Sequence, residues 1–219
     1  AHGVTILEGV GLDRLLGEGR VTGARLTDGR DLPADFVIAG VGILPGTALA
    51  GRTDITFELG CGHGHWLAAY AAAHPQEFCV GIDLITHRVE RSVRKQTLGK
   101  LDNVIFLKAE ATEFLEALPT AVVLRKIFIL YPDPWPKKKH HKHRFIQTAS
   151  LDLLAQRAAA GARLHFRTDD ADYFEWTRTH LAEHATWNLQ TETTWPFEQT
   201  TFFEERMTAK RDLEAERVP

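Results

Sequence analysis

Residues 127–144 read Ile-Phe-Ile-Leu-Tyr-Pro-Asp-Pro-Trp-Pro-Lys-Lys-Lys-His-His-Lys-His-Arg, and they join an apolar run to a proline-rich loop and a cationic run. The apolar, β-branched residues 127–130 predict a buried strand. The prolines that follow stop a helix or a strand ladder and stiffen the backbone. Asp133 and Trp135 are therefore expected on a rigid loop at the end of a strand, where open α/β sheets bind ligands.

The cationic run follows this loop directly and carries four lysines, three histidines and one arginine between residues 137 and 144. A basic run alone is most often a solvated surface. A carboxylate and a flat aromatic placed just before it suit a nucleotide base that is attached to a phosphate backbone. The combination predicts a nucleic-acid contact.

On both sides of this stretch the pattern alternates between strands and helices. Such alternation predicts an α/β fold with a doubly wound, mostly parallel sheet. We expect Gly161 to end the helix at residues 145–159 in the C-cap position. The expected strands are residues 55–59, 78–82, 104–108, 127–130, 163–168, 187–194 and 201–207, and the expected helices are residues 66–73, 88–98, 113–117, 145–159 and 172–184.

The first fifty residues differ in character and predict a small β-rich appendage, with strands at residues 4–7, 21–26 and 34–42. The composition changes near Gly51, so we expect two domains, residues 1–51 and 52–219. Residues 1–50 resemble a fragment of the FAD-dependent pyridine-nucleotide reductases, of the ferredoxin- and rubredoxin-reductase kind. The likeness lies in Gly19-Arg20-Val21-Thr22-Gly23, Asp28-Gly29-Arg30 and residues 34–47. That family's glycine fingerprint is absent, which predicts a fragment without its own cofactor site.

The bulk composition places limits on function. The net charge is −3 over 219 residues, so any nucleic-acid affinity must come from a local patch. Two cysteines, Cys61 and Cys79, make no disulfide framework and fit a reducing compartment. No signal peptide and no apolar run long enough to span a bilayer are evident. We therefore expect a cytoplasmic, globular protein that does not contact a membrane.

A glycine-rich turn follows the strand at residues 55–59. Gly60, Gly62 and Gly64 would let a ligand approach the backbone closely. Glu58 lies just before the turn, where a carboxylate would repel a pyrophosphate and attract a ligand with an ammonium and a sulfonium group. S-adenosylmethionine carries both groups.

Acidic residues end the next two strands of the pattern. Asp83 lies about 20 residues beyond the turn, where an acid commonly binds ribose hydroxyls, and Glu110 could meet an adenine edge. Each acid alone could be a helix cap, but together with Glu58 they favour a nucleoside site. Cys61, His63 and His65 alternate without an apparent fourth ligand, so we predict no metal site.

Residues 54–213 resemble the bacterial tRNA (guanine-N7-)-methyltransferase family. The glycine turn is shared widely among class I methyltransferases, whereas the Tyr-Pro-Asp-Pro-Trp-Pro-Lys-Lys-x-His-His-Lys stretch is specific to this family. Arg167-Thr168-Asp169 and Thr201-Phe202-Phe203-Glu204 match two further family motifs. The resemblance implies a Rossmann-like, class I S-adenosylmethionine-dependent methyltransferase domain with tRNA as its partner, and it implies no protein partner.

The resemblance also implies roles for single residues. Asp133 is the expected catalytic residue, and it either accepts from the guanine or orients the methionine ammonium of the cofactor. Expected cofactor contacts are Glu58, Asp83, Glu110 and Asp133, beside the glycines of the turn. Expected substrate contacts are Lys137, Asp169, Thr201, Phe202, Phe203 and Glu204. Expected RNA contacts are Lys138, Lys139, His140, His141, Lys142, His143 and Arg144.

The implied reaction is methyl transfer to N7 of a guanine, expected to be guanine-46 of the tRNA variable loop. This N7 has a lone pair and no proton, so the enzyme needs to supply proximity and alignment rather than a general base. Trp135 is expected to pack rather than to stack on the base.

Two alternative functions are considered. One is a flavin or nicotinamide reductase, suggested by residues 1–50. The other is a non-catalytic RNA-binding protein, which the intact Glu58, Asp83 and Asp133 argue against.

Overall fold

The computed structural model describes residues 10–17, 22–33, 49, 52–200 and 209–219. The chain divides into two compact units, residues 1–42 and 43–219, and each is considered by itself. This division lies earlier in the chain than the composition change near Gly51. The sequence predictions for strands at residues 4–7 and 34–42 fall outside the described residues.

The described part of the first unit is an antiparallel sheet in the order β1-β2-β3. Its strands are β1 (Leu12–Leu16), β2 (Gly23–Leu26) and β3 (Asp31–Pro33). The turn between β2 and β3 uses Gly29 at φ 87°, a conformation that glycine adopts without strain. The sequence predicted β2 and this turn, whereas it missed the two flanking strands.

The second unit is built on a sheet whose order among the described residues is β6-β5-β4-β7-β8-β10-β9. The first five strands in this order are parallel, and β10 runs antiparallel to both of its neighbours. The α/β, mostly parallel sheet predicted from the sequence is confirmed. The strands are β4 (Asp54–Leu59), β5 (Cys79–Asp83), β6 (Val104–Lys108), β7 (Val123–Leu130), β8 (Ala158–Thr168), β9 (Trp187–Leu189) and β10 (Arg211–Arg217).

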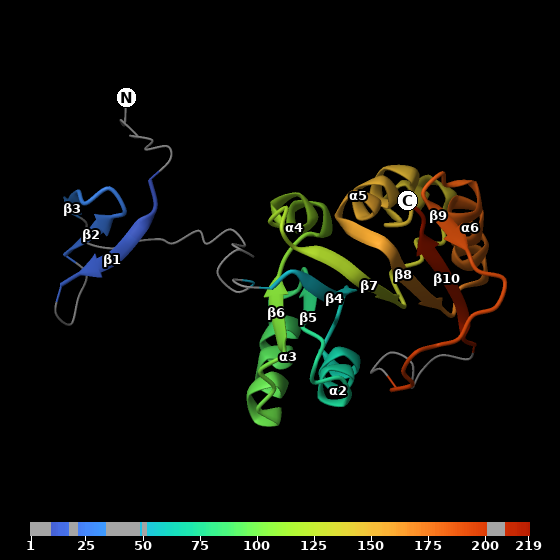
Figure 1. Cartoon of the computed structure of the whole chain (residues 1–219), viewed down its shortest axis with the longest axis horizontal. Helices are drawn as coiled ribbons and strands as arrows, with labels where there is room; N and C mark the ends of the chain where they lie inside the picture. Colours follow the sequence, from blue (N-terminus) through green and yellow to red (C-terminus); the bar gives the residue numbers. More distant parts are fainter. Residues whose placement is uncertain (1–9, 18–21, 34–48, 50–51, 201–208) are drawn as a thin grey trace. The chain divides into compact units, whose positions relative to one another are not determined.

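Helices cover both faces of this sheet, with α2 and α3 on one face and α4, α5 and α6 on the other (Figure 1). Within the described ranges, no helix combines the length and apolar character that crossing a lipid bilayer requires. The helices are α2 (His65–Ala73), α3 (Thr86–Gly99), α4 (Ala111–Ala117), α5 (Thr148–Arg157), α6 (Ala171–Glu183) and the 3-10 helix η1 (Lys138–His143).

The central strand β7 is buried on both faces, which explains its unbroken apolar run. Ile127 and Ile129 belong to the core cluster under α4, α5 and α6. Phe128 and Leu130 alternate with them and belong to the cluster under α2 and α3. A parallel strand covered on both faces has no solvent side, so it carries no polar alternation.

Strand β8 has one apolar face and one polar face. Leu164 and Phe166 point into the cluster under α4, α5 and α6. The intervening His165 and Arg167 are buried on the opposite face, where β10 pairs Glu214 with His165 and Asp212 with Arg167. No described helix lies over this polar strip. It is partly covered by residues 195–198, which contact Trp66 of α2 and Arg167.

The fourth predicted helix ends earlier than the sequence indicated. α5 stops at Arg157, and Ala158 already has extended backbone angles and pairs with Leu124 of β7. Gly161 is therefore not a helix C-cap, and that prediction was wrong. It lies within β8 at φ 76°, in the irregular stretch where the register between β7 and β8 shifts. Strand pairing has overridden the helix propensity of the alanines at 158–160.

The last strands also differ from the sequence prediction. The run at 187–194 forms a strand only over Trp187–Leu189. The strand expected at 201–207 falls on residues outside the described ranges. The sheet instead contains β10 at Arg211–Arg217, which the sequence analysis did not predict.

We predict that the second unit needs residues 49–52 but not residues 1–42. Leu49 is 2% exposed within the main core cluster, and the Arg52 guanidinium lies 4.4 Å from the centre of the Phe78 ring. Removing residues 1–51 should lower the free energy of unfolding of this unit by about 2–5 kcal/mol, as loss of a buried leucine does. Removing residues 1–42 should leave it unchanged, measured by denaturant unfolding.

Two substitutions in the whole chain provide the control. Leu49→Ala should reproduce the loss, whereas Leu32→Ala on β3, where the leucine is 39% exposed, should change the stability of the second unit by no more than about 0.5 kcal/mol. Equal unfolding curves for the two truncated chains would show that Leu49 contributes nothing to this core.

Candidate active site

The predicted site residues gather at one edge of the sheet. Glu58 lies near the carboxyl end of β4, Asp83 ends β5, and Glu110 follows β6. Asp133 follows β7, and Asp169 follows β8. Because these five strands are parallel, their carboxyl ends meet at the same edge. The strand order reverses between β4 and β7, which is where doubly wound sheets bind ligands.

The turn from β4 into α2 depends on its glycines. Gly60, Gly62 and Gly64 have φ values of 72°, 55° and 66°, a region that side chains rarely adopt. A Cβ on Gly64 would lie 2.7 Å from the Ser92 side chain, so α3 packs closely against the turn. The position of a Cβ on Gly60 has no described atom within 4 Å. The backbone of Gly60 is therefore open to a ligand.

Asp83 fixes this turn to the end of β5. Its buried carboxylate accepts a hydrogen bond from the Gly62 amide at 3.0 Å and one from the Ile85 amide at 2.8 Å. The Arg88 guanidinium lies 3.7 Å away. A carboxylate has about four lone-pair positions, so Asp83 retains acceptor capacity for a ligand after these two bonds.

Glu58 is the buried ionisable group of the site with the fewest hydrogen-bond partners among the described residues. Its side chain is only 3% exposed, and Oε2 has no hydrogen-bond partner among the described residues. Burial, aided by the negative charge of Asp83, raises the pKa of Glu58 to about 8. The carboxyl therefore holds a proton at neutral pH. A buried, strongly perturbed acid at a strand end is typical of a functional site.

Glu110 has a structural role that the sequence allowed as an alternative. Its backbone is extended, and its Oε2 accepts from the Glu113 amide at 3.0 Å, which caps the N-terminus of α4. Such a cap satisfies one of the free amides of the first helical turn. The predicted contact between Glu110 and a cofactor remains a prediction.

The loop after β7 presents Asp133 to solvent. Tyr131 and Trp135 both have positive φ, at 48° and 46°, which is unusual for large side chains. The Tyr131 amide donates to the Arg167 carbonyl at 2.7 Å, so the start of the loop is tied to β8. Asp133 is exposed on this constrained loop, at the edge that also carries the glycine turn.

The cationic run forms the short helix η1. Lys137 precedes it with extended backbone angles, and its carbonyl accepts from the His140 amide. His140 and His141 are half-buried. The exposed residues of the run are Lys137, Lys138, Lys139, Lys142 and His143, and the four lysines among them are cations.

Arg144 differs from the exposed lysines, and its predicted contact with RNA stays a prediction. Its side chain is buried, where it pairs with Asp172 at 2.5 Å and donates to the Pro134 carbonyl at 2.7 Å. The guanidinium also lies over the rings of Tyr173 and Trp176. The Arg144 guanidinium holds the pKa of Asp172 below its ordinary value. Arg144 therefore anchors the proline-rich loop to α6.

Trp135 packs against its own loop rather than in a core. Its ring centre lies 5.0 Å from that of His143 and 5.9 Å from that of His140. The residue remains 37% exposed. It thus lies on the same surface as the exposed lysines.

Asp169 follows β8 directly and is half-buried at the same edge. Its carbonyl accepts from Arg211 at 2.7 Å, and the next residue, Asp170, caps the N-terminus of α6. The remaining predicted substrate residues, Thr201, Phe202, Phe203 and Glu204, lie outside the described ranges.

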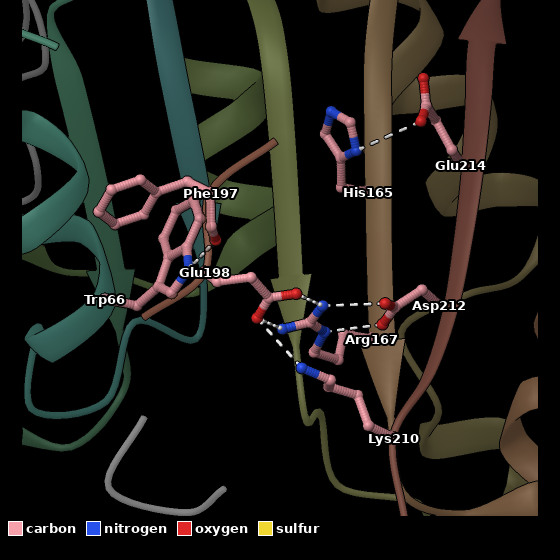
Figure 2. A network of polar contacts seen from close by, with 8 residues as sticks. All are labelled: Trp66, His165, Arg167, Phe197, Glu198, Lys210, Asp212 and Glu214. Carbon is pink, nitrogen blue, oxygen red and sulfur yellow. Dashed lines mark hydrogen bonds and ion pairs between the residues drawn. The ribbon is translucent and has the colours of Figure 1, made fainter. Parts of the chain in front are cut away.

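The sequence analysis missed the polar network around Arg167. Figure 2 shows the guanidinium held between Asp212 of β10 and Glu198. Lys210 donates to the same Glu198 carboxylate at 3.1 Å. Arg167 was noted only as part of a motif. The pairing with Asp212 follows from the β8–β10 register, so it could have been found only if β10 had been predicted.

Comparison with known sequences places this chain among methyltransferases. Residues 52–215 match the model of a family described as putative methyltransferase. The tRNA (guanine-N(7)-)-methyltransferase of Rhodospirillum rubrum is 34% identical over 168 residues, which cover 76% of this chain and 65% of that protein. The enzyme of the same name from Magnetococcus marinus is 39% identical over 139 residues, covering 63% and 54%. That from Nitrosococcus oceani is 34% identical over 177 residues, covering 80% and 75%.

Solved structures support the same fold at lower identity. The 16S rRNA methyltransferase KamB aligns with a TM-score of 0.56 at 15% identity and covers 84% of this chain and 97% of that chain. TrmN from Thermus thermophilus aligns with a TM-score of 0.55 at 14% identity and covers 79% and 48%.

The family match begins just before β4 and ends within β10, so it contains the whole carboxyl edge described above. The chain spans 65% and 54% of the first two curated relatives, and thus not their full length. The match, the relatives and the sheet order agree. The chain belongs to the bacterial tRNA (guanine-N7-)-methyltransferase family.

Proposed function

We propose that this chain transfers a methyl group from S-adenosylmethionine to N7 of a guanine in tRNA, with guanine-46 of the variable loop as the expected target. The observation that carries the proposal is that two features lie on the neighbouring strands β4 and β7, where the strand order reverses. One is the glycine turn with the unpaired Glu58 carboxyl, and the other is the Asp133 loop with its exposed cations. The relatives carry the name of this activity.

The residues at the glycine turn fit S-adenosylmethionine. When bound, this compound supplies an electrophilic methyl group on a sulfonium centre. Gly60 offers open backbone, and Asp83 retains acceptor capacity for ribose hydroxyls. The orphaned carboxyl of Glu58 is matched by a cationic ligand, because a positive charge would favour its ionised form.

Asp133 is assigned to the guanine rather than to the cofactor. The buried Glu58 already offers a carboxyl to a cation, whereas Asp133 is exposed on the loop after β7. Its carboxylate can accept from N1 and from the exocyclic amine of guanine. N7 lies on another edge of the base and would then face away from Asp133. Because N7 carries a free lone pair, Asp133 acts by orientation and removes no proton.

The exposed cations of η1 are assigned to the tRNA backbone. The whole chain has a net charge of −3, so attraction to phosphates must come from such a local cluster. Lys137 comes four residues after Asp133, and Asp169 follows β8, the strand that pairs with β7; both are assigned to substrate positioning. A tRNA substrate places the proposed reaction in the cytoplasm.

The direct test is methylation of transcribed tRNA with labelled S-adenosylmethionine, followed by mapping of borohydride- and aniline-sensitive positions. We expect a single new cleavage site in the variable loop. Asp133→Asn should lower kcat/KM by roughly 100-fold, since misplacement of a reacting group costs this much. Asp102→Asn, an exposed acid before β6, is the matched control and should retain activity. Absence of label from every tRNA would exclude the proposal.

A second prediction concerns the buried Glu58. Its folded pKa of about 8 lies above its ordinary value of 4.5, so the folded state retains a proton that the unfolded state loses. The resulting stability is fully present below pH 4.5 and is lost as the pH rises through 8. Between pH 5 and pH 9 the ligand-free protein should lose about 3–5 kcal/mol relative to Glu58→Gln, which cannot ionise.

Urea unfolding of both proteins across this pH range measures the difference. Glu183→Gln, which removes an exposed carboxylate from the end of α6, should follow the wild-type curve. Parallel curves for wild type and Glu58→Gln would mean that Glu58 is ionised in the folded protein.

A third prediction concerns the exposed lysines of η1. Replacing Lys138, Lys139 and Lys142 by glutamine should weaken tRNA binding and flatten its dependence on salt, by close to one unit of slope for each phosphate that the variant no longer neutralises. Affinity for S-adenosylmethionine should not change. Filter binding at several salt concentrations measures the slope.

The matched control neutralises Arg91, Arg94 and Lys95 on α3, which changes the net charge equally. If both triple variants flatten the salt dependence to the same extent, the effect comes from the overall charge and not from η1.

A further inference from the structure

Arg167 is a buried cation that, within the part of the chain the structure describes, pairs with carboxylates from two different segments. The residue is 1% exposed. Asp212 of β10 accepts from Nε at 2.7 Å and from Nη2 at 2.8 Å. Glu198 accepts from Nη1 at 3.1 Å and from Nη2 at 3.0 Å. Paired bonds from one guanidinium fix the orientation of each carboxylate, as Figure 2 shows.

Glu198 ends a short segment, residues 195–198, that we call the strap. The strap crosses the polar strip of the sheet toward α2, where the Trp66 indole donates to the Phe197 carbonyl at 3.3 Å (Figure 2). The Phe197 ring packs edge-on against Tyr70, with 5.5 Å between ring centres. At the other end, the Arg167 guanidinium lies 3.7 Å from the centre of the Trp195 ring. Arg167 therefore holds the strap by an ion pair and by a cation–π contact.

The backbone of Arg167 holds a second segment, the loop that carries Asp133. Arg167 is paired with Leu130 in the β7–β8 ladder, and its carbonyl accepts from the Tyr131 amide at 2.7 Å. Asp133 comes two residues after Tyr131, and Asp169 comes two residues after Arg167. One residue thus joins the strap to both acids that the proposed function assigns to substrate.

Arg167 does not need the Glu198 carboxylate to balance its buried charge. Asp212 alone neutralises Arg167 and occupies two of its donors, and it comes from the neighbouring strand. Glu198 has a side chain that is 58% exposed, and it also binds Lys210. Glu198 and Lys210 flank Thr201 to Glu204 in the sequence. The pair with Glu198 therefore serves to attach the strap to the strand end.

We propose that Arg167 is a positioning residue for tRNA methylation, acting through Glu198 to hold the strap in place beside the Asp133 loop. The inference rests on the proposed function, since it assigns a role within that reaction. Arg167 touches neither reactant in this role. It sets where the strap and the substrate acids lie relative to each other.

Glu198→Gln in the whole chain tests the proposal, because it removes one charge from the strap and leaves the Arg167–Asp212 pair intact. We expect kcat/KM for tRNA to fall by about 10- to 100-fold, since small displacements of positioning groups have effects of this size. Calorimetry with S-adenosylhomocysteine should give one site and an affinity within about twofold of wild type. A loss of folded protein would lower the number of sites instead.

Glu175→Gln is the matched control, because Glu175 is also 58% exposed and also pairs with an arginine, Arg178, on α6. It should leave kcat/KM unchanged. A double-mutant cycle adds a second measurement: Arg167→Lys combined with Glu198→Gln should be no less active than Arg167→Lys alone.

The outcomes separate the two proposals. A wild-type chain that fails to methylate tRNA overturns the proposed function, and this inference with it. An active wild type with Glu198→Gln equal to the control, or with additive losses in the double variant, overturns the positioning role alone. If Arg167→Lys fails to fold, the comparison of Glu198→Gln with Glu175→Gln decides.

Discussion

The reversal of strand order between β4 and β7 is the constraint on which this structure depends. A parallel sheet needs a crossover connection between neighbouring strands, and such connections have one hand. From β4 the chain winds outward through α2 and α3 on one face, and from β7 it winds the other way through α5 on the opposite face (Figure 1). The loops that leave β4 and β7 therefore diverge. The glycine turn and the Asp133 loop leave these two strands, and sheets of this kind bind ligands outside that point.

Beyond β7 the two faces of the sheet differ in polarity, and antiparallel β10 pairs with β8 there. Under α4, α5 and α6 the strands present Leu164, Phe166, Leu213 and Ala215. On the opposite face β8 and β10 present charged pairs, including Arg163 with Glu214 and Glu216 and Arg167 with Asp212. A buried charge is tolerated when a partner satisfies it, and the direct cross-strand register supplies that partner. His165 lies between them and stays neutral, because burial lowers its pKa to about 4.

The sequence predicted most of the sheet because the strand and helix periodicities of residues 54–184 are local. It failed where the deciding interaction was distant. Ala158 to Ala160 have helical propensity, yet pairing with β7 makes them a strand. β10 has only Leu213 and Ala215 as apolar residues among charges, so its pattern was too weak to identify. The sequence identified the acids at the strand ends, but it did not identify the groups that they bind in the folded chain.

Arg144 and Arg167 show why a basic residue cannot be assigned from its neighbours in sequence alone. Arg144 ends a cationic run, but α6 supplies Asp172 and two aromatic rings that bury it. Arg167 is buried between Asp212 and Glu198. Both charges are balanced inside the protein, so both act on the structure. Glu58 differs, because it is equally buried but no described side chain balances it, and only a proton keeps it neutral. A ligand that carries a positive charge can replace that proton, which is why the unpaired acid rather than the paired arginines marks the place where a cationic ligand would bind.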